Sequence, residues 1–310
     1  MKDLNFSNLY ISIIVPIYNY NRNVSKFLKS LMEQNFNRNQ YEIIMVDNGS
    51  TDNTVNTLKK YAVKVILEHD HLNSPYSARN RGIERAKGNV IVLLDSTCIP
   101  IKTWLTEGIR CLKKEHADII GGNLIFRYDG KKTAAKVLDA ITNVKMKNSI
   151  EERKIAKTGN LFIRREVFNT IGLFPEGIRS GGDVRWTRRA VRAGFKMVFC
   201  EAASVSYPAK PLVNLIKKQW RVGLGQPEIW LQEIEENYNF IYVLKKFLSK
   251  LVLLHIIKPK KEAKPLKGII LKEEKNIFRL KVLVIGLLIN IIMIMANYIG
   301  IFNLKRINHD

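Results

Sequence analysis

The sequence predicts an α/β protein in which a doubly wound, mostly parallel sheet is flanked by helices and followed by a helical tail that associates with a membrane. Two observations predict the sheet: short aliphatic runs alternate with helical patterns in the first third of the chain, and two of these runs end in an aspartate. A third predicts the tail, because residues 282–302 form an uncharged stretch long enough to span a bilayer.

The expected elements follow from residue spacing. Residues 90–94 are five aliphatic residues between Gly88 and Pro100, which is typical of a strand buried on both faces of a parallel sheet. Apolar residues at helical spacing predict the helices, and turn-forming residues separate the elements. In order, we expect strands over 11–15, 41–46, 63–67 and 90–94, with helices over 24–31, 54–61 and 75–87 between them.

Composition sets limits on function. The chain has 310 residues, of which 46% are hydrophobic and 25% charged, so it can bury a large core. A formal net charge of +23 favours polyanions: nucleic acid, an anionic membrane or phosphorylated small molecules. No RNA-binding, zinc-finger or helix-turn-helix signature is present, so we expect no nucleic acid as a partner. Cys98, Cys111 and Cys200 indicate neither a disulfide framework nor a zinc site, and a reducing compartment is the default.

Two aspartates stand at the expected carboxyl ends of strands, where open α/β sheets bind ligands. Asp47 begins a polar run, 47–52, and Asp95 directly follows residues 90–94. From the residues alone, Asp95 is equally explained as a cap for the next helix and Asp47 as a turn former. Neither a dinucleotide-binding fingerprint nor a P-loop is present.

Seven short motifs follow one another along the chain. They are Val15-Pro16-Ile17-Tyr18-Asn19, residues 46–52, Ala78-Arg79-Asn80-Arg81-Gly82, residues 93–96, residues 158–165, Ile171-Gly172-Leu173-Phe174 and Ser180-Gly181-Gly182-Asp183. In this order and spacing they resemble the family 2 glycosyltransferases, which have the GT-A fold and invert the anomeric centre. Each motif is weak by itself, and their joint order over about residues 10–225 makes the resemblance strong.

The resemblance implies that the first half of this region binds a nucleoside diphosphate sugar. An aromatic face at Tyr18, with ordinary loop packing as the alternative, and the carboxylate and amide of Asp47 and Asn48 suit a base and ribose. Arg79 and Arg81 do not share a helix face, and we favour Arg79 as the residue that approaches the diphosphate. The implied donor-binding residues are Pro16, Tyr18, Asn19, Asp47, Asn48, Arg79, Asp95, Ser96, Thr97 and Arg221.

In the family, the strand that ends at Asp95 carries Asp-x-Asp, whose carboxylates hold a divalent metal on the diphosphate. Here Thr97 replaces the second aspartate. Asp95 is therefore the implied ligand for Mg²⁺ or Mn²⁺, and the missing carboxylate puts metal dependence in doubt.

The second half of the region is expected to bind the acceptor and to supply the base. Inversion requires a carboxylate opposite the leaving group to take the acceptor hydroxyl's proton, and the family places it in a turn like 180–183. We therefore assign Asp183 as the catalytic base, with helix capping as the alternative and compatible role. Acceptor contacts are expected from Gly159, Asn160, Gly182, Trp186 and Trp220.

Residues 219–225 resemble the family's mobile segment over the bound donor, with glycines as hinges and Arg221 reaching phosphate. We expect a glycosyltransferase domain over 1–225, whose halves 10–120 and 121–225 bind donor and acceptor, and a basic helical linker over 226–281. The stretch 282–302 is expected to be a transmembrane or membrane-embedded helix. Lys and Arg lie mainly on its N-terminal side, which predicts a catalytic body on the cytoplasmic face of the cell membrane with a single-pass C-terminal anchor.

The predicted function is transfer of a sugar from a nucleoside diphosphate sugar to a hydroxyl of a glycan or lipid-linked acceptor in cell-surface polysaccharide synthesis. The main alternative is a noncatalytic nucleotide-sugar-binding or scaffold protein, because Thr97 interrupts the metal motif.

Overall fold

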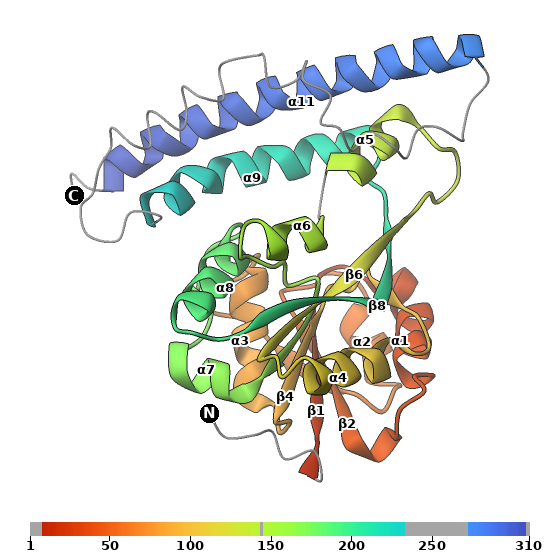
Figure 1. Ribbon diagram of the computed structural model, residues 1–310, viewed down its shortest axis with the longest axis vertical. Coiled ribbons are helices and arrows are strands. Elements are labelled where there is room, and N and C mark those ends of the chain that lie inside the picture. The colour runs from red at the N-terminus through yellow and green to blue at the C-terminus, as the bar shows by residue number, and fades with distance from the viewer. Residues whose placement is uncertain (1–7, 143–144, 233–271, 308–310) are drawn as a thin grey trace. The chain divides into compact units, whose positions relative to one another are not determined.

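The computed structural model describes residues 8–142, 145–232 and 272–307, and it divides into two compact units (Figure 1). The sheet unit consists of Met1–Arg127 and Val144–Pro208. The helical unit consists of Tyr128–Asn143 and Ala209–Asp310. This division falls after Pro208 and moves 128–143 to the helical unit, whereas the sequence suggested one domain up to residue 225. Most of the predicted linker, 233–271, lies outside the described residues.

The sheet unit contains one eight-stranded sheet in the order β3-β2-β1-β4-β7-β6-β8-β5. Its first half is parallel, as expected, while β7 runs antiparallel to both β4 and β6, so the sheet is mixed and mostly parallel. The strands are β1 (Ile11–Ile17), β2 (Tyr41–Asp47), β3 (Lys64–Leu67), β4 (Val90–Leu94), β5 (Ile99–Pro100), β6 (Ile119–Arg127), β7 (Asn160–Arg164) and β8 (Met197–Pro208).

Helices cover both faces of the sheet, which explains the unbroken aliphatic strands (Figure 1). Alternate residues of β1 and β4 enter two separate cores, with Ile13 and Val92 in one and Ile14 and Leu93 in the other. The first core includes α1 (Val24–Met32) and α4 (Trp104–Lys114). The second includes α3 (Pro75–Arg85), α6 (Met146–Glu151), α7 (Arg165–Ile171) and α8 (Gly182–Arg192). The short helices are α2 (Thr54–Leu58), η2 (Asn21–Asn23) and η3 (Arg38–Gln40).

A disulfide joins Cys111 of α4 to Cys200 of β8, and Cys98 is a buried free thiol. This corrects the expectation that no disulfide is present. The two cysteines are 89 residues apart in sequence, and their Cα atoms come within 6.3 Å only because α4 packs on β8.

The helical unit contains α5 (Ala134–Thr142), α9 (Leu212–Gln232) and α11 (Lys272–Ile307), with α9 and α11 side by side (Figure 1). Small residues permit this close approach: a Cβ on Gly223 would lie 2.7 Å from the Cβ of Ala296, and one on Gly300 would lie 2.5 Å from the carbonyl oxygen of Leu224. Within the described residues, 277–302 of α11 is the one helical stretch long and apolar enough to cross a membrane, judged by length and composition alone.

The predicted mobile segment, 219–225, lies inside α9, where Gly223 packs against Ala296 of α11. Its role over a bound donor stays a prediction.

Candidate active site

The carboxyl ends of β1 and β2 lie side by side because the two strands are parallel and adjacent. Asp47, at the end of β2, is buried, and its Oδ2 accepts a hydrogen bond of 3.0 Å from the amide of Ser50. Its Oδ1 is also buried but finds no hydrogen-bond partner among the described residues. A buried acceptor without a partner is costly, so this oxygen is available to a donor group on a ligand.

The loops around Asp47 hold the other residues predicted for the base and ribose. Asn48 is buried, and its Oδ1 accepts from the amide of Asn73 at 3.1 Å. Asn19 has a left-handed φ of 47°, and its Oδ1 accepts a hydrogen bond of 2.8 Å from the amide of Thr51. Tyr18 is exposed and so is not a core residue, while Pro16 is half-buried within β1.

Asp95 follows β4 at the same edge of the sheet. Its Oδ1 lies 2.5 Å from Nη2 of Arg79, a residue that is 3% exposed. A Cβ on Gly159 would approach Oδ2 of Asp95 to 3.2 Å, so the glycine keeps space beside that oxygen. Ser96 and Thr97 are half-buried, and the carbonyl oxygen of Ser96 accepts from the hydroxyl of Tyr20 at 2.5 Å.

Burial raises the pKa of Tyr20 to about 12, with the nearby charge of Arg127 opposing the shift. The Tyr20 hydroxyl therefore remains a donor to the loop that follows Asp95 throughout the neutral pH range.

Asp183 lies in the first turn of α8, after Gly181, which has a left-handed φ of 84° and occupies the cap position. Asp183 is therefore not the cap residue, although its carboxylate is close to the positive end of the helix. Its Oδ1 accepts from the hydroxyl of Tyr76 at 3.1 Å and from the amide of Val184 at 2.9 Å.

One helix connects the two acids. Tyr76 and Arg79 are three residues apart on α3, with the Arg79 guanidinium carbon 5.7 Å from the centre of the Tyr76 ring. Tyr76 contacts Asp183 and Arg79 contacts Asp95, so α3 holds both carboxylates in one constellation. Tyr76 was not among the residues predicted from the sequence, although its position three residues before Arg79 was a signal that the two share a face.

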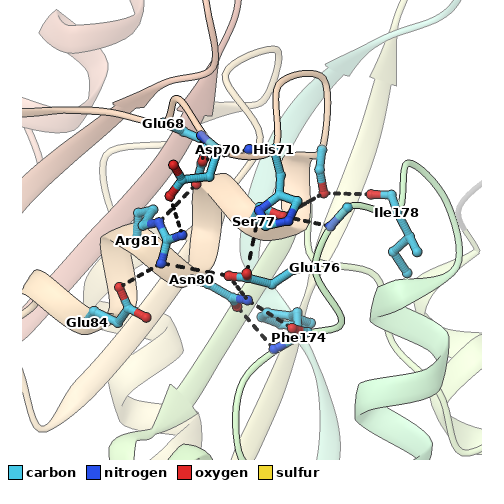
Figure 2. Close-up of polar contacts among 12 residues, drawn as sticks. Glu68, Asp70, His71, Ser77, Asn80, Arg81, Glu84, Phe174, Glu176 and Ile178 are labelled. Atoms are coloured by element: carbon cyan, nitrogen blue, oxygen red, sulfur yellow. Dashed lines mark hydrogen bonds and ion pairs between the residues drawn. The ribbon is translucent and has the colours of Figure 1, made fainter.

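Arg81 does not share the environment of Arg79 and lies among carboxylates, which Figure 2 shows. It forms ion pairs of 3.2 Å with the buried carboxylate of Glu68 and 2.8 Å with Asp70, and it also lies near Glu84 and Glu176. The sequence prediction that only one of the two arginines faces the site is consistent with this arrangement.

Two predicted acceptor residues are buried and form hydrogen bonds inside the protein. Asn160 is completely buried, and its side chain accepts from the indole N–H of Trp104 and donates to two backbone carbonyls. Trp186 is 1% exposed and donates its indole N–H to the carbonyl of Gly172. Both side chains are thus bonded inside the protein, and contact of either one with an acceptor stays a prediction.

The remaining acceptor-side predictions fall in different places. Gly159 lies beside Asp95, and Gly182 packs under Tyr76. Trp220 and Arg221 belong to α9 in the helical unit, where both are exposed, and their roles stay predictions. Among the described residues, no group of three or more His, Cys, Asp and Glu side chains could hold a metal ion.

Comparison with known proteins assigns the fold and the enzyme class. Residues 12–172 match the sequence model of Glycosyl transferase family 2. The chain is 39% identical over 249 residues to glycosyltransferase AglE of Haloferax volcanii, covering 78% of this chain and 82% of that protein. It is 23% identical over 264 residues to a dolichyl N-acetyl-α-D-glucosaminyl phosphate 3-β-D-2,3-diacetamido-2,3-dideoxy-β-D-glucuronosyltransferase of Methanococcus voltae, covering 80% and 81%.

A solved structure shares the fold: the mannosyltransferase PcManGT of Pyrobaculum calidifontis, in complex with GDP-Man and Mn²⁺. It superimposes with a TM-score of 0.63 at 15% identity, covering 94% of this chain and 87% of that one. The mixed sheet flanked by helices is thus of the GT-A type. The extent of the family match and the identity to AglE agree, and this chain belongs to glycosyl transferase family 2 and is a glycosyltransferase enzyme.

Proposed function

We propose that this glycosyltransferase transfers a sugar from a nucleoside diphosphate sugar to a hydroxyl of a glycan or lipid-linked acceptor, with inversion, in cell-surface polysaccharide synthesis. The observation that carries the proposal is the pair of acids that α3 holds: Asp95 through Arg79 and Asp183 through Tyr76. Asp95 suits the diphosphate side of the reaction and Asp183 suits the acceptor side, and catalysis by displacement requires groups on both sides.

In the proposed reaction, the acceptor oxygen bonds to the anomeric carbon while the bond from that carbon to the diphosphate breaks. The leaving nucleoside diphosphate takes the electron pair, and Asp183 takes the acceptor's proton. The partnerless Oδ1 of Asp47 would accept from the base or ribose of the donor, beside the exposed ring of Tyr18. Arg79, held at Asp95, would contribute positive charge near the diphosphate.

A divalent metal fits this site only in part. Arg79 already engages Oδ1 of Asp95, which leaves Oδ2 as the oxygen for Mg²⁺ or Mn²⁺, and Thr97 supplies no carboxylate. A bound metal would neutralise charge on the diphosphate as the leaving group departs. The PcManGT structure with Mn²⁺ makes metal use plausible for this fold. We propose that diphosphate oxygens would complete the coordination beside Asp95.

The proposal of a lipid-linked acceptor rests on two observations. The M. voltae relative is named for a dolichyl phosphate-linked acceptor, and α11 carries an apolar stretch that could attach this chain to a membrane. We propose that the protein works at the cytoplasmic face, since basic residues are concentrated on the N-terminal side of that stretch. A single-pass anchor remains the proposed arrangement.

A noncatalytic nucleotide-sugar binder is the second candidate, and Thr97 is the observation that favours it. The two are separated by measuring donor binding and sugar transfer in the same variants, with a panel of nucleoside diphosphate sugars as donors. We expect Asp183→Asn to bind donor normally and to lose transfer by at least about 100-fold, because general base catalysis contributes about 10² to 10⁴ in rate.

In that experiment Asp47→Asn should weaken donor binding, whereas Asp70→Asn, an exposed acid outside the site, should change neither property. Donor binding without transfer in the unmodified protein would show the noncatalytic alternative. A product of retained anomeric configuration would overturn the role of Asp183.

A further inference from the structure

Three polar side chains on one face of α3 bind the backbone of the segment that leads to Asp183 (Figure 2). They are Ser74, the N-cap residue of α3, and Ser77 and Asn80 within the helix, spaced three apart. Asn80 is completely buried and bonds both backbone groups of one residue. The bonds are Ser74 Oγ to Ile178 O at 2.7 Å, Gly177 N to Ser77 Oγ at 3.0 Å, Phe174 N to Asn80 Oδ1 at 3.1 Å and Asn80 Nδ2 to Phe174 O at 2.8 Å.

These hydrogen bonds between α3 and residues 174–178 also fix the position of Tyr76. The ring of Phe174 lies 5.9 Å from that of Tyr76 and 5.0 Å from that of Trp186, so the aromatic side chains form one buried layer. On its other side Tyr76 packs against Gly182, where a Cβ would lie 2.9 Å from the ring. The glycine before Asp183 therefore allows the ring to lie against the backbone, and the phenol then reaches the carboxylate.

The Tyr76 hydroxyl is a fixed donor. Burial raises the pKa of Tyr76 far above its ordinary value, and the charge of Asp183 raises it further. The phenol thus stays protonated and donates to Oδ1 of Asp183. That oxygen also accepts from the amide of Val184, so both hydrogen bonds that the described residues make to this carboxylate fall on Oδ1.

We propose that Tyr76 is a positioning residue that orients Asp183 so that Oδ2 is the oxygen that accepts the acceptor's proton. The inference rests on the proposed role of Asp183 as the base. Two hydrogen bonds on Oδ1 fix the carboxylate plane and leave Oδ2 to face the acceptor hydroxyl. Tyr76 itself does not touch substrate in this mechanism.

The test is a double-mutant cycle on the full-length protein with Tyr76→Phe and Asp183→Asn. Tyr76→Phe removes one oxygen and keeps the ring against Gly182 and Phe174. We expect the kcat of transfer to fall about 10- to 100-fold, since a small misplacement of a reacting group has an effect of that order, while the donor KM changes by less than about 2-fold. In the Asp183→Asn background, the same substitution should lower the remaining rate by less than about 3-fold.

Tyr61→Phe is the matched control, because it also removes a hydroxyl that donates to a side-chain oxygen, that of Ser25, in the sheet unit. It should leave kcat and KM unchanged. Thermal unfolding of each variant monitors the fold. If Tyr76→Phe raises the donor KM as well as lowering kcat, the substitution loosens the site generally, and this result would overturn the positioning role.

The outcomes separate this inference from the function on which it rests. If Asp183→Asn transfers sugar at a normal rate, the assignment of the base fails and the positioning role fails with it. If Asp183→Asn is inactive but Tyr76→Phe is normal, the base stands and Tyr76 has no role in orienting it. Equal losses from Tyr76→Phe in both backgrounds would also overturn the inference, because Tyr76 would then act independently of Asp183.

Discussion

The two units of this enzyme differ in how far their apolar side chains are buried. In the sheet unit, the aliphatic residues of β1, β2 and β4 are almost all fully buried between layers of helices. In the helical unit, α11 buries one stripe against α5 and α9 and leaves large apolar side chains exposed along most of its length. The exposed residues are Ile277, Leu280, Leu283, Val284, Leu287, Leu288, Ile291, Met295, Tyr298, Ile299 and Phe302.

The two units also differ in the partners of their buried polar groups. In the sheet unit, Arg79 pairs with Asp95 beside the carboxyl end of β4, and Asp47, at the end of β2, has one buried oxygen without a partner among the described residues. The helical unit contains the pair of Asp139 with Lys218, at 3.4 Å, and also Asn297, whose completely buried amide has no partner among the described residues. The sheet unit thus keeps its aliphatic strand residues inside, whereas the helical unit exposes an apolar surface of the kind that marks a membrane or protein interaction site.

The largest effect is expected from charges on the exposed stripe of α11. The triple substitution Leu280→Lys, Ile291→Lys and Met295→Lys should lower the membrane-bound fraction by at least about 50-fold, because one lysine at the centre of a membrane helix costs about 2.5 to 3.5 kcal/mol. Sedimentation with vesicles measures this fraction.

The matched control places the same added charge on exposed apolar residues of the sheet unit, as Leu67→Lys, Leu72→Lys and Ile125→Lys. This variant should stay with the vesicles. Equal release of both variants would mean that charge rather than the α11 surface controls binding, and the contrast between the units would lose its functional meaning.

An intermediate effect is expected from glycines that permit close packing. Gly223→Ala would force α9 away from Ala296 and the backbone of Met293, and overpacking of this kind costs about 1 to 3 kcal/mol. Gly286→Ala meets only a methyl of Leu138 at 3.7 Å, an ordinary contact, and gains up to about 1 kcal/mol in helix propensity. Thermal unfolding should therefore shift down for the first variant and up for the second.

Gly108→Ala extends the comparison to the sheet unit, where the new Cβ would lie 2.2 Å from the ring of Phe162. We expect a loss comparable to that of Gly223→Ala or larger, since a ring packed in the core has less room to move. A neutral result at Gly223 would show that the two helices are not closely packed.

The smallest effect concerns pH and the helical unit. Burial lowers the pKa of Lys218 to about 8, with the charge of Asp139 opposing the shift. The unfolded chain then binds more protons than the folded protein between pH 8 and the ordinary lysine value, so stability rises with pH. Between pH 7 and 9 the gain should be about 1 kcal/mol.

Chemical denaturation of the detergent-solubilised protein at several pH values measures this gain, and Lys218→Met should remove it. If the unmodified protein and Lys218→Met show the same slope, Lys218 is not the group responsible. The sheet unit's Tyr20 does not contribute in this range, because burial raises its pKa to about 12.

The sequence by itself determined the first four strands, the family and the acids at the strand ends. Residues 90–94 are a strand in the structure with the same bounds, and residues 282–302 lie within α11. These features are local, since β-branched runs, turn residues and apolar length each act within a few neighbours. The motifs around Asp47, Asp95 and Asp183 were found for the same reason.

Only the tertiary structure decided which side chains face the site. It buried Asn160 and Trp186, paired Cys111 with Cys200, and brought Tyr76 to Asp183 across 107 positions of sequence. Each of these depends on which element packs against which, and such long-range contacts leave no periodic signal along the chain. Gly182 is the clearest example. The glycine is visible in the sequence, but the ring of Tyr76 that requires it belongs to another helix.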